Sequence, residues 1–118
     1  MPWKTVRLEL ASCREFPRGS VGRSYLIRLP LTADGAIDDS LLDADPDGAT
    51  ARRFWASEPD AAGYFRLDRA GYAIMEDNGN SGCTRPIQFL DGVIHQGDLV
   101  LMIEPDGSQL SLRVASVG

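Results

Sequence analysis

The sequence contains few of the residues on which catalytic and metal sites are commonly built. It has two cysteines, Cys13 and Cys83, and a single histidine, His95, among 118 residues. Two cysteines are too few for a disulfide scaffold, so we expect free thiols in a reducing compartment. Zinc sites draw their cysteine and histidine ligands from closely spaced pairs, which this sequence lacks. We therefore predict no metal site and no bound cofactor.

Long hydrophobic runs are also missing. The longest, Leu99–Ile103, is strand-sized, whereas a membrane-spanning helix needs about 20 apolar residues. Residues 1–10 contain no apolar segment of the kind found in a signal peptide. These absences predict a cytoplasmic protein without a membrane partner.

The formal net charge is -5, and it is distributed unevenly. Residues 1–28 carry six basic and two acidic side chains, and the rest of the chain carries six basic and fifteen acidic ones. Strong general binding to nucleic acid requires net neutralisation of phosphates, so the acidic total argues against that partner. The hydrophobic content of 43% is ordinary for a globular protein, and the length suits one domain over residues 1–118.

Alternating polar and apolar residues predict a protein built mainly from β-strands. In residues 4–11, Val6, Leu8 and Leu10 share one face, which is the pattern of a half-buried strand. Comparable segments, separated by turn residues, cover 24–31, 51–57, 64–67, 72–76, 85–89, 98–104 and 109–117. This pattern predicts an all-β fold, or a mainly β fold with one short helix. We expect a small antiparallel β-barrel or β-sandwich.

Two strands carry more detailed expectations. Pro30 cannot donate to a ladder of hydrogen bonds, which predicts an edge position or a bulge. Residues 99–103 are apolar on both faces of their strand, and we therefore expect that strand to be the most buried.

The segment between the second and third predicted strands is acidic and weakly helical. Asp38 or Asp39 would cap a short helical turn that continues through Leu42, and Pro46 and Gly48 would end it.

The acidic loop 43–48, DADPDG, begins like a calcium-binding loop. Its three aspartates fall at the first, third and fifth ligand positions of an EF-hand loop, and its glycine falls at the sixth. The match then fails, because the twelfth position requires a bidentate carboxylate and is occupied by Phe54. We interpret this segment as an acidic surface loop, with weak calcium binding as the alternative.

Cys83 and His95 are the candidates for an enzymatic role. Cys83 follows a glycine-rich segment, and a histidine can activate a thiol nucleophile. The sequence contains no GxSxG nucleophile elbow and no phosphate-binding loop. We therefore predict no catalytic residue, and a small enzyme using Cys83 or His95 remains an alternative.

The segment RRFW, residues 52–55, is the strongest candidate for a binding site. In an extended conformation, Arg52 and Phe54 face one side of the strand, and Arg53 and Trp55 face the other. Arginine beside an exposed aromatic ring suits recognition of an anion, a nucleotide or a protein. We predict that Arg52, Arg53 and Trp55 bind a small ligand or a protein partner, as part of a non-enzymatic binding module. The competing interpretation places an aromatic ring in the core and the arginines on the surface.

An ordered set of segments resembles a family of small, uncharacterised bacterial proteins. The set comprises KTVRLELA, REFPRGS, ADGAID, RRFW, GDLVLMIEPDG and LRVASV, and it spans nearly the full chain. The resemblance implies a self-contained, mostly β domain, and it brings no activity, cofactor or catalytic residue with it. The aspartates of DADPDG are not part of the family pattern.

Overall fold

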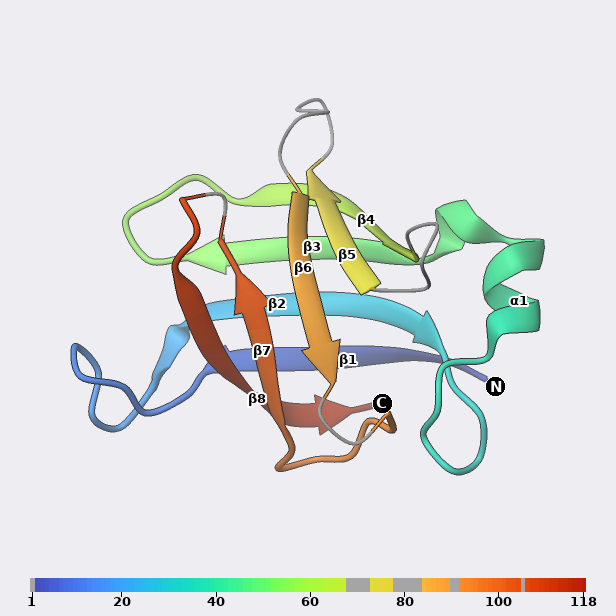
Figure 1. Cartoon of the computed structure of the whole chain (residues 1–118), viewed down its shortest axis with the longest axis horizontal. Coiled ribbons are helices and arrows are strands. Elements are labelled where there is room, and N and C mark those ends of the chain that lie inside the picture. The colour runs from blue at the N-terminus through green and yellow to red at the C-terminus, as the bar shows by residue number, and fades with distance from the viewer. Residues whose placement is uncertain (1, 68–72, 78–83, 90–91, 105) are drawn as a thin grey trace.

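Eight antiparallel strands in the described part of the chain form one sheet that closes into a barrel (Figure 1). The computed structural model describes residues 2–67, 73–77, 84–89, 92–104 and 106–118. The strands are β1 (Trp3–Leu10), β2 (Ser20–Pro30), β3 (Thr50–Trp55), β4 (Ala61–Leu67), β5 (Ala73–Asp77), β6 (Thr84–Phe89), β7 (Leu99–Ile103) and β8 (Gln109–Val117). Each strand pairs with the next along the chain, and β8 pairs with β1. Of the two predicted architectures, the structure therefore has the barrel.

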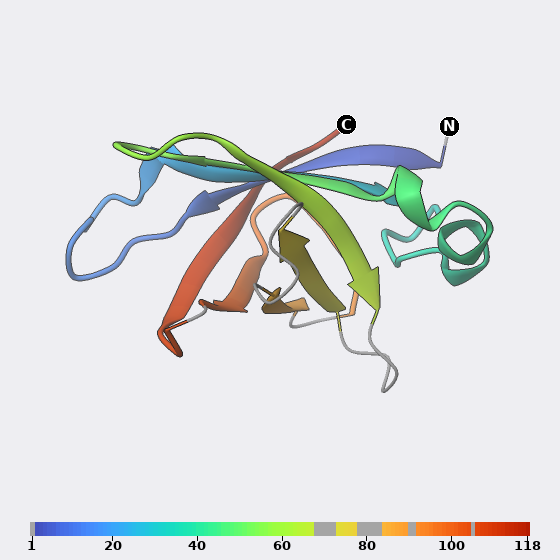
Figure 2. The same cartoon turned by 90° about the horizontal axis from the view of Figure 1, so that it is seen from above.

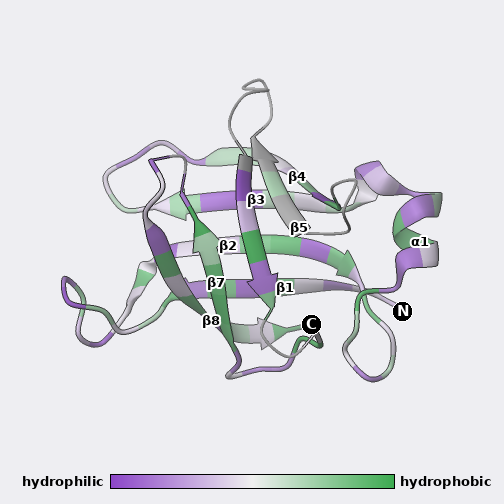
Figure 3. Cartoon of the chain, viewed as in Figure 1, coloured by the Kyte–Doolittle hydropathy of each residue, from purple (hydrophilic) through white to green (hydrophobic). Residues whose placement is uncertain are grey.

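The barrel is flattened, with two walls that face each other across the core. Figure 2 shows β1–β3 on one side and β5–β7 on the other, while β4 and β8 pass between the two walls. Val6 and Leu8 of β1 lie opposite Ile27 and Tyr25 of β2, so their side chains meet on the inner face. Hydrophobic and hydrophilic bands alternate along strands such as β6 (Figure 3). The predicted period of two is therefore the basis of the core.

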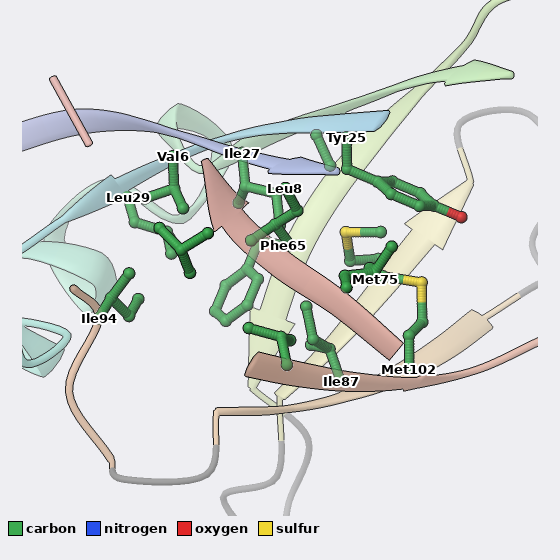
Figure 4. Close-up of a cluster of buried hydrophobic side chains, with 14 of the residues drawn as sticks. Val6, Leu8, Tyr25, Ile27, Leu29, Phe65, Met75, Ile87, Ile94 and Met102 are labelled. Carbon is green, nitrogen blue, oxygen red and sulfur yellow. The ribbon is translucent and has the colours of Figure 1, made fainter. Parts of the chain in front are cut away.

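The core is aliphatic with few aromatic rings. Phe65 and Ile27 are fully buried near its centre (Figure 4). Its other fully or almost fully buried members include Val6, Leu8, Leu29, Met75, Ile87, Val100, Met102, Leu112 and Val114. An eight-stranded barrel has an interior just wide enough for side chains to fill it or for one small ligand to bind.

Two short helices precede β3. The helix α1 (Asp39–Ala44) begins after Asp38, whose carboxylate accepts a hydrogen bond of 3.2 Å from the backbone nitrogen of Leu41. The 3-10 turn η1 (Pro46–Gly48) follows directly. The predicted short helix and its aspartate cap are thus confirmed. Within the described ranges, no helix has the length and apolar character needed to cross a membrane.

One end of the barrel, hereafter the closed end, is capped by the buried side chains of Leu31, Leu42 and Ile94. Ile94 lies beside Leu29 at one end of the core cluster (Figure 4). Its backbone nitrogen donates to the carbonyl oxygen of Gly35 at 2.8 Å, which joins two connecting loops over the core. Gly35 has a φ of 91°, and a Cβ added there would lie 2.9 Å from the Ile94 carbonyl oxygen. This close approach requires glycine.

Two expectations about individual strands are corrected by the structure. Strand β7 is not the most buried, because Leu99 is 49% exposed while Val100 is fully buried. Strands of a closed barrel turn alternate side chains outward, so apolar residues on the outer face remain exposed. Pro30 lies at neither a sheet edge nor a bulge. It is the last residue of β2 and pairs with Trp3.

Candidate ligand-binding site

The end of the barrel opposite the closed end contains an open pocket of about 550 Å³, hereafter the mouth. Its walls include Phe16 from the loop after β1, Arg23 from β2, Arg53 and Trp55 from β3, and Glu104 directly after β7. Pockets that take small molecules have volumes of roughly 300–1,000 Å³ and often lie in the mouths of β-barrels. The size and position of this pocket therefore suit a small ligand.

Two arginines and two aromatic residues alternate on the inner face of β2 and β3, so that each arginine lies opposite an aromatic residue. Arg23 lies opposite Trp55, and Tyr25 lies opposite Arg53. The rings of Tyr25 and Trp55 are 5.8 Å apart between centroids, and the Arg53 guanidinium lies 4.4 Å from the Trp55 centroid. A guanidinium over an aromatic face is attracted by the electron density of the ring. Each charged group is therefore packed against an aromatic ring.

A continuous hydrogen-bonded network connects Arg53 to the opposite wall of the barrel. Its Nε donates to the Tyr25 hydroxyl at 3.2 Å, and its Nη1 lies 2.8 Å from Oε2 of Glu58. The Tyr25 hydroxyl donates to Oε1 of Glu104 at 3.3 Å, and Arg85 Nε donates to Oε2 of Glu104 at 3.2 Å. In the described residues, no buried side-chain nitrogen or oxygen lacks a partner. The network therefore satisfies its own buried polar groups.

Burial and the neighbouring charges determine the protonation states of this network. Burial, followed by the charge of Glu104, raises the pKa of Tyr25 to about 12, so its hydroxyl keeps its proton at neutral pH. Burial lowers the pKa of Arg53, but hydrogen bonds to Glu58 and Tyr25 outweigh it and raise that pKa above its usual value. Arg53 is therefore a permanent positive charge, and Tyr25 is a neutral donor to Glu104.

Arg23 provides the second positive charge on the inner face of β2 and β3. Its guanidinium lies 4.2 Å from the centroid of the Phe16 ring, and its Nη1 donates to Oγ of Ser20 at 3.2 Å. Arg53 has Glu58 and Arg85 has Glu104 as carboxylate partners, but no carboxylate of the described residues pairs with Arg23. Among the described residues, the mouth therefore holds one positive charge more than these pairs neutralise.

The structure separates the three residues predicted to bind a ligand. Arg53 and Trp55 line the mouth, while Arg52 is exposed on the outer face of β3, with its guanidinium 5.3 Å from the Phe54 ring centroid. The predicted alternation along residues 52–55 is confirmed. The competing interpretation holds in part, since Trp55 packs against the core and Arg52 lies on the surface.

Sequence reasoning missed Tyr25, Arg23, Arg85 and Glu104 as parts of this site. Tyr25 reads as one of several apolar residues in its strand, and Glu104 reads as the polar end of another. Only the register of β2 with β3, and the closure of the barrel, bring these residues next to Arg53.

Neither candidate for an enzymatic role lies in the described part of the mouth. His95 is at the closed end with its side chain 61% exposed, and its Nε2 lies 3.1 Å from the Asp34 carbonyl oxygen. Cys83 lies outside the described residues. Cys13 is an exposed free thiol and is one of the residues that line the mouth.

Oxygen atoms of Asp47 and Gly48 in the acidic loop 43–48 contact arginine side chains. Oδ1 of Asp47 is 3.0 Å from Nη2 of Arg66, and the Gly48 carbonyl oxygen accepts a 3.0 Å hydrogen bond from Arg28. Asp43 lies within α1, and Asp45 lies between the two helices. Across the described ranges, no three acidic, histidine or cysteine side chains gather in a group that could hold a metal ion.

Comparisons of the chain with protein-family models, with curated proteins and with solved structures find no match. The resemblance to a bacterial family therefore stays a prediction, and the function has to be argued from the mouth.

Proposed function

We propose that the protein is a non-enzymatic binding module that holds a small molecule in the mouth of the barrel. The observation that carries this proposal is the open pocket of about 550 Å³ with the cation of Arg53 fixed in its wall. Small-molecule sites combine an apolar lining with a few fixed polar groups that orient the ligand. Trp55 and Leu110 supply apolar surface, and Arg53 supplies the fixed charge.

Because Arg53 is held in a fixed position, it is better suited to bind a ligand than a mobile surface arginine would be. A free arginine side chain loses rotamer freedom when it contacts a ligand, which weakens binding. Arg53 is already held by Tyr25, Glu58 and the Trp55 ring, so most of that ordering takes place during folding. The mouth is therefore preorganised for its ligand.

A cytoplasmic location is part of the same proposal. The support for it is Cys13, an exposed thiol without a disulfide partner. Exposed free thiols persist in reducing compartments.

The experiment that tests the proposal compares two neighbouring arginines. Native mass spectrometry of the purified protein reports any retained molecule, and a thermal-shift screen of small metabolites reports those that raise Tm by binding the folded state. We expect the stabilising compound to lose its effect on Arg53→Met and to keep it on Arg52→Met. Arg52 is the matched control because it is adjacent but exposed on the outer face. Binding that depends on Arg52 and not on Arg53, or no retained molecule and no stabilising compound, would overturn the proposal.

A further inference from the structure

We propose that the ligand of the mouth is an aromatic carboxylate with a single negative charge, which Arg23 and Arg53 receive together. This inference rests on the proposed binding function and specifies its ligand class. It depends on three features of the mouth: its charge, the spacing of its arginines and its aromatic lining.

The charge of the mouth selects a monoanion. Arg53 is paired with Glu58, and Arg85 is paired with Glu104, so Arg23 is the one of these three arginines that has no carboxylate partner among the described residues. Arg14 and Glu15, on the adjacent loop, cancel each other in charge. One added negative charge neutralises the described side chains that line the mouth. A dianion such as a phosphate monoester would bring a second charge close to Glu104 with no cation left to balance it.

The positions of Arg23 and Arg53 suit a carboxylate as the anionic group. They are diagonal neighbours on the inner face of β2 and β3, because Arg23 lies opposite Trp55 and Arg53 opposite Tyr25. Diagonal positions on a sheet face are about 7–8 Å apart, within reach of long side chains. Guanidinium groups present planar, paired donors that match two oxygens of a carboxylate or of a phosphate. The single charge of a carboxylate is what favours it over a phosphate monoester here.

The lining of the mouth selects an aromatic body for the ligand. The Phe16 ring centroid lies 4.2 Å from the Arg23 guanidinium, and the Trp55 ring centroid lies 4.4 Å from the Arg53 guanidinium. Leu10 and Leu110 add apolar surface. Aromatic rings pack favourably against each other in tilted or offset arrangements, as Tyr25 and Trp55 already do here. A flat ring can therefore contact Trp55 and Phe16 while its carboxylate reaches the arginines.

The test uses 2-naphthoate, its neutral analogue 2-naphthamide and its dianionic analogue 2-naphthyl phosphate as probes. Binding is followed by NMR at the indole N–H groups of the two tryptophans, which the Trp3→Phe variant assigns. Trp55 lines the mouth, whereas Trp3 begins β1 at the closed end and packs beneath Arg28. We expect 2-naphthoate to shift the Trp55 signal and leave that of Trp3 in place. We expect 2-naphthamide and 2-naphthyl phosphate to bind at least tenfold more weakly.

Variants of the full chain test whether the carboxylate of 2-naphthoate contacts Arg23. Arg23→Met should weaken 2-naphthoate binding by about tenfold to a hundredfold, the usual loss for one hydrogen bond to a charged group. Arg52→Met should leave the affinity unchanged, since Arg52 faces outward. Arg23 makes no ion pair within the described residues, and its variant is therefore expected to fold.

The outcomes separate this inference from the proposed function. Equal binding of 2-naphthamide at Trp55, or equal or tighter binding of 2-naphthyl phosphate there, would overturn the proposal of a singly charged ligand while leaving a ligand site in the mouth. A retained ligand of another class, together with no naphthoate binding, would do the same. If none of the three probes shifts the Trp55 signal and no retained or stabilising compound is found, both the ligand class and the proposed binding function are overturned.

Discussion

The closed end and the mouth of the barrel are built from the same eight described strands, yet they end the interior in different ways. At the closed end, Leu31 and Ile94 cover the core, and backbone hydrogen bonds tie their loops together. At the mouth, the core ends at Tyr25, whose hydroxyl points away from the aliphatic cluster (Figure 4). One end excludes water with apolar side chains, and the other presents a charged network to an open pocket.

This difference divides the small fold into an apolar part that stabilises it and a charged part that we propose binds a ligand. Full burial of an aliphatic side chain contributes roughly 1.5–3 kcal/mol to folding. A buried ion pair contributes little net stability, because removing two charges from water offsets most of their attraction. The pair Arg85–Glu104 and the buried Tyr25 hydroxyl are thus hard to explain as stabilising elements alone. The Tyr25 hydroxyl accepts a hydrogen bond from Arg53 and donates one to Glu104, which connects this pair to the arginine of the pocket wall.

The largest expected effect tests the apolar interior. Phe65→Ala should lower the free energy of unfolding by about 3–5 kcal/mol, because it leaves a cavity where a fully buried ring packed. Urea unfolding followed by circular dichroism measures this loss. The control is Val21→Ala, which removes an exposed side chain and should change stability by less than about 0.5 kcal/mol. A loss below about 1 kcal/mol for Phe65→Ala would contradict the assignment of stability to this interior.

The next effect compares two carboxylates that pair with arginines of the hydrogen-bonded network around Tyr25. Glu104→Gln should cost about 2–3 kcal/mol, because Arg85 and Tyr25 both lose a charged partner in a buried position. Glu58→Gln should cost less than about 1 kcal/mol, since Glu58 is 51% exposed and its ion pair with Arg53 is screened by water. The same unfolding experiment measures both. Equal costs would show that the network is no more buried than an ordinary surface pair.

A smaller effect comes from the titration of Tyr25. Its pKa is about 12 in the folded protein and about 10 in the unfolded chain. A raised pKa contributes stability that is complete below pH 10 and is lost as the pH rises from 10 to 12. Between pH 9 and pH 11, the wild type should therefore lose about 1 kcal/mol more than Tyr25→Phe, which has no proton to release. Parallel losses in the two proteins would show that the hydroxyl is not buried.

The fold was largely predictable because its signals are local. The alternation of Val6, Leu8 and Leu10, and the aspartate before α1, each act over a few residues. A period of two, however, does not indicate whether a sheet closes. The choice between barrel and sandwich depends on the pairing of β1 with β8, at opposite ends of the chain.

The site was only partly predictable because its residues are distant in the sequence. Arg53 and Trp55 stood out as a basic and aromatic pair, but Arg52 carried the same signal and lies on the other face. Tyr25 and Glu104 are 79 residues apart, and only barrel closure brings their side chains together. The expectation for β7 failed for a related reason, since outward-facing apolar residues are indistinguishable by type from buried ones.

The smallest expected effect concerns calcium and the acidic loop 43–48, which lies in the connection between β2 and β3 at the closed end. A calcium site with a Kd of about 0.5 mM would add about 1.4 kcal/mol of stability in 5 mM calcium. We expect no measurable rise in Tm, because Asp47 is held by Arg66 and the Gly48 carbonyl oxygen by Arg28. Arg66→Gln is the informative variant, since it removes the cation from Asp47. A calcium response in the wild type would place a ligand site at the closed end and end the division between a stabilising end and a binding end. A response in Arg66→Gln alone would show that the arginine is what keeps the ion out.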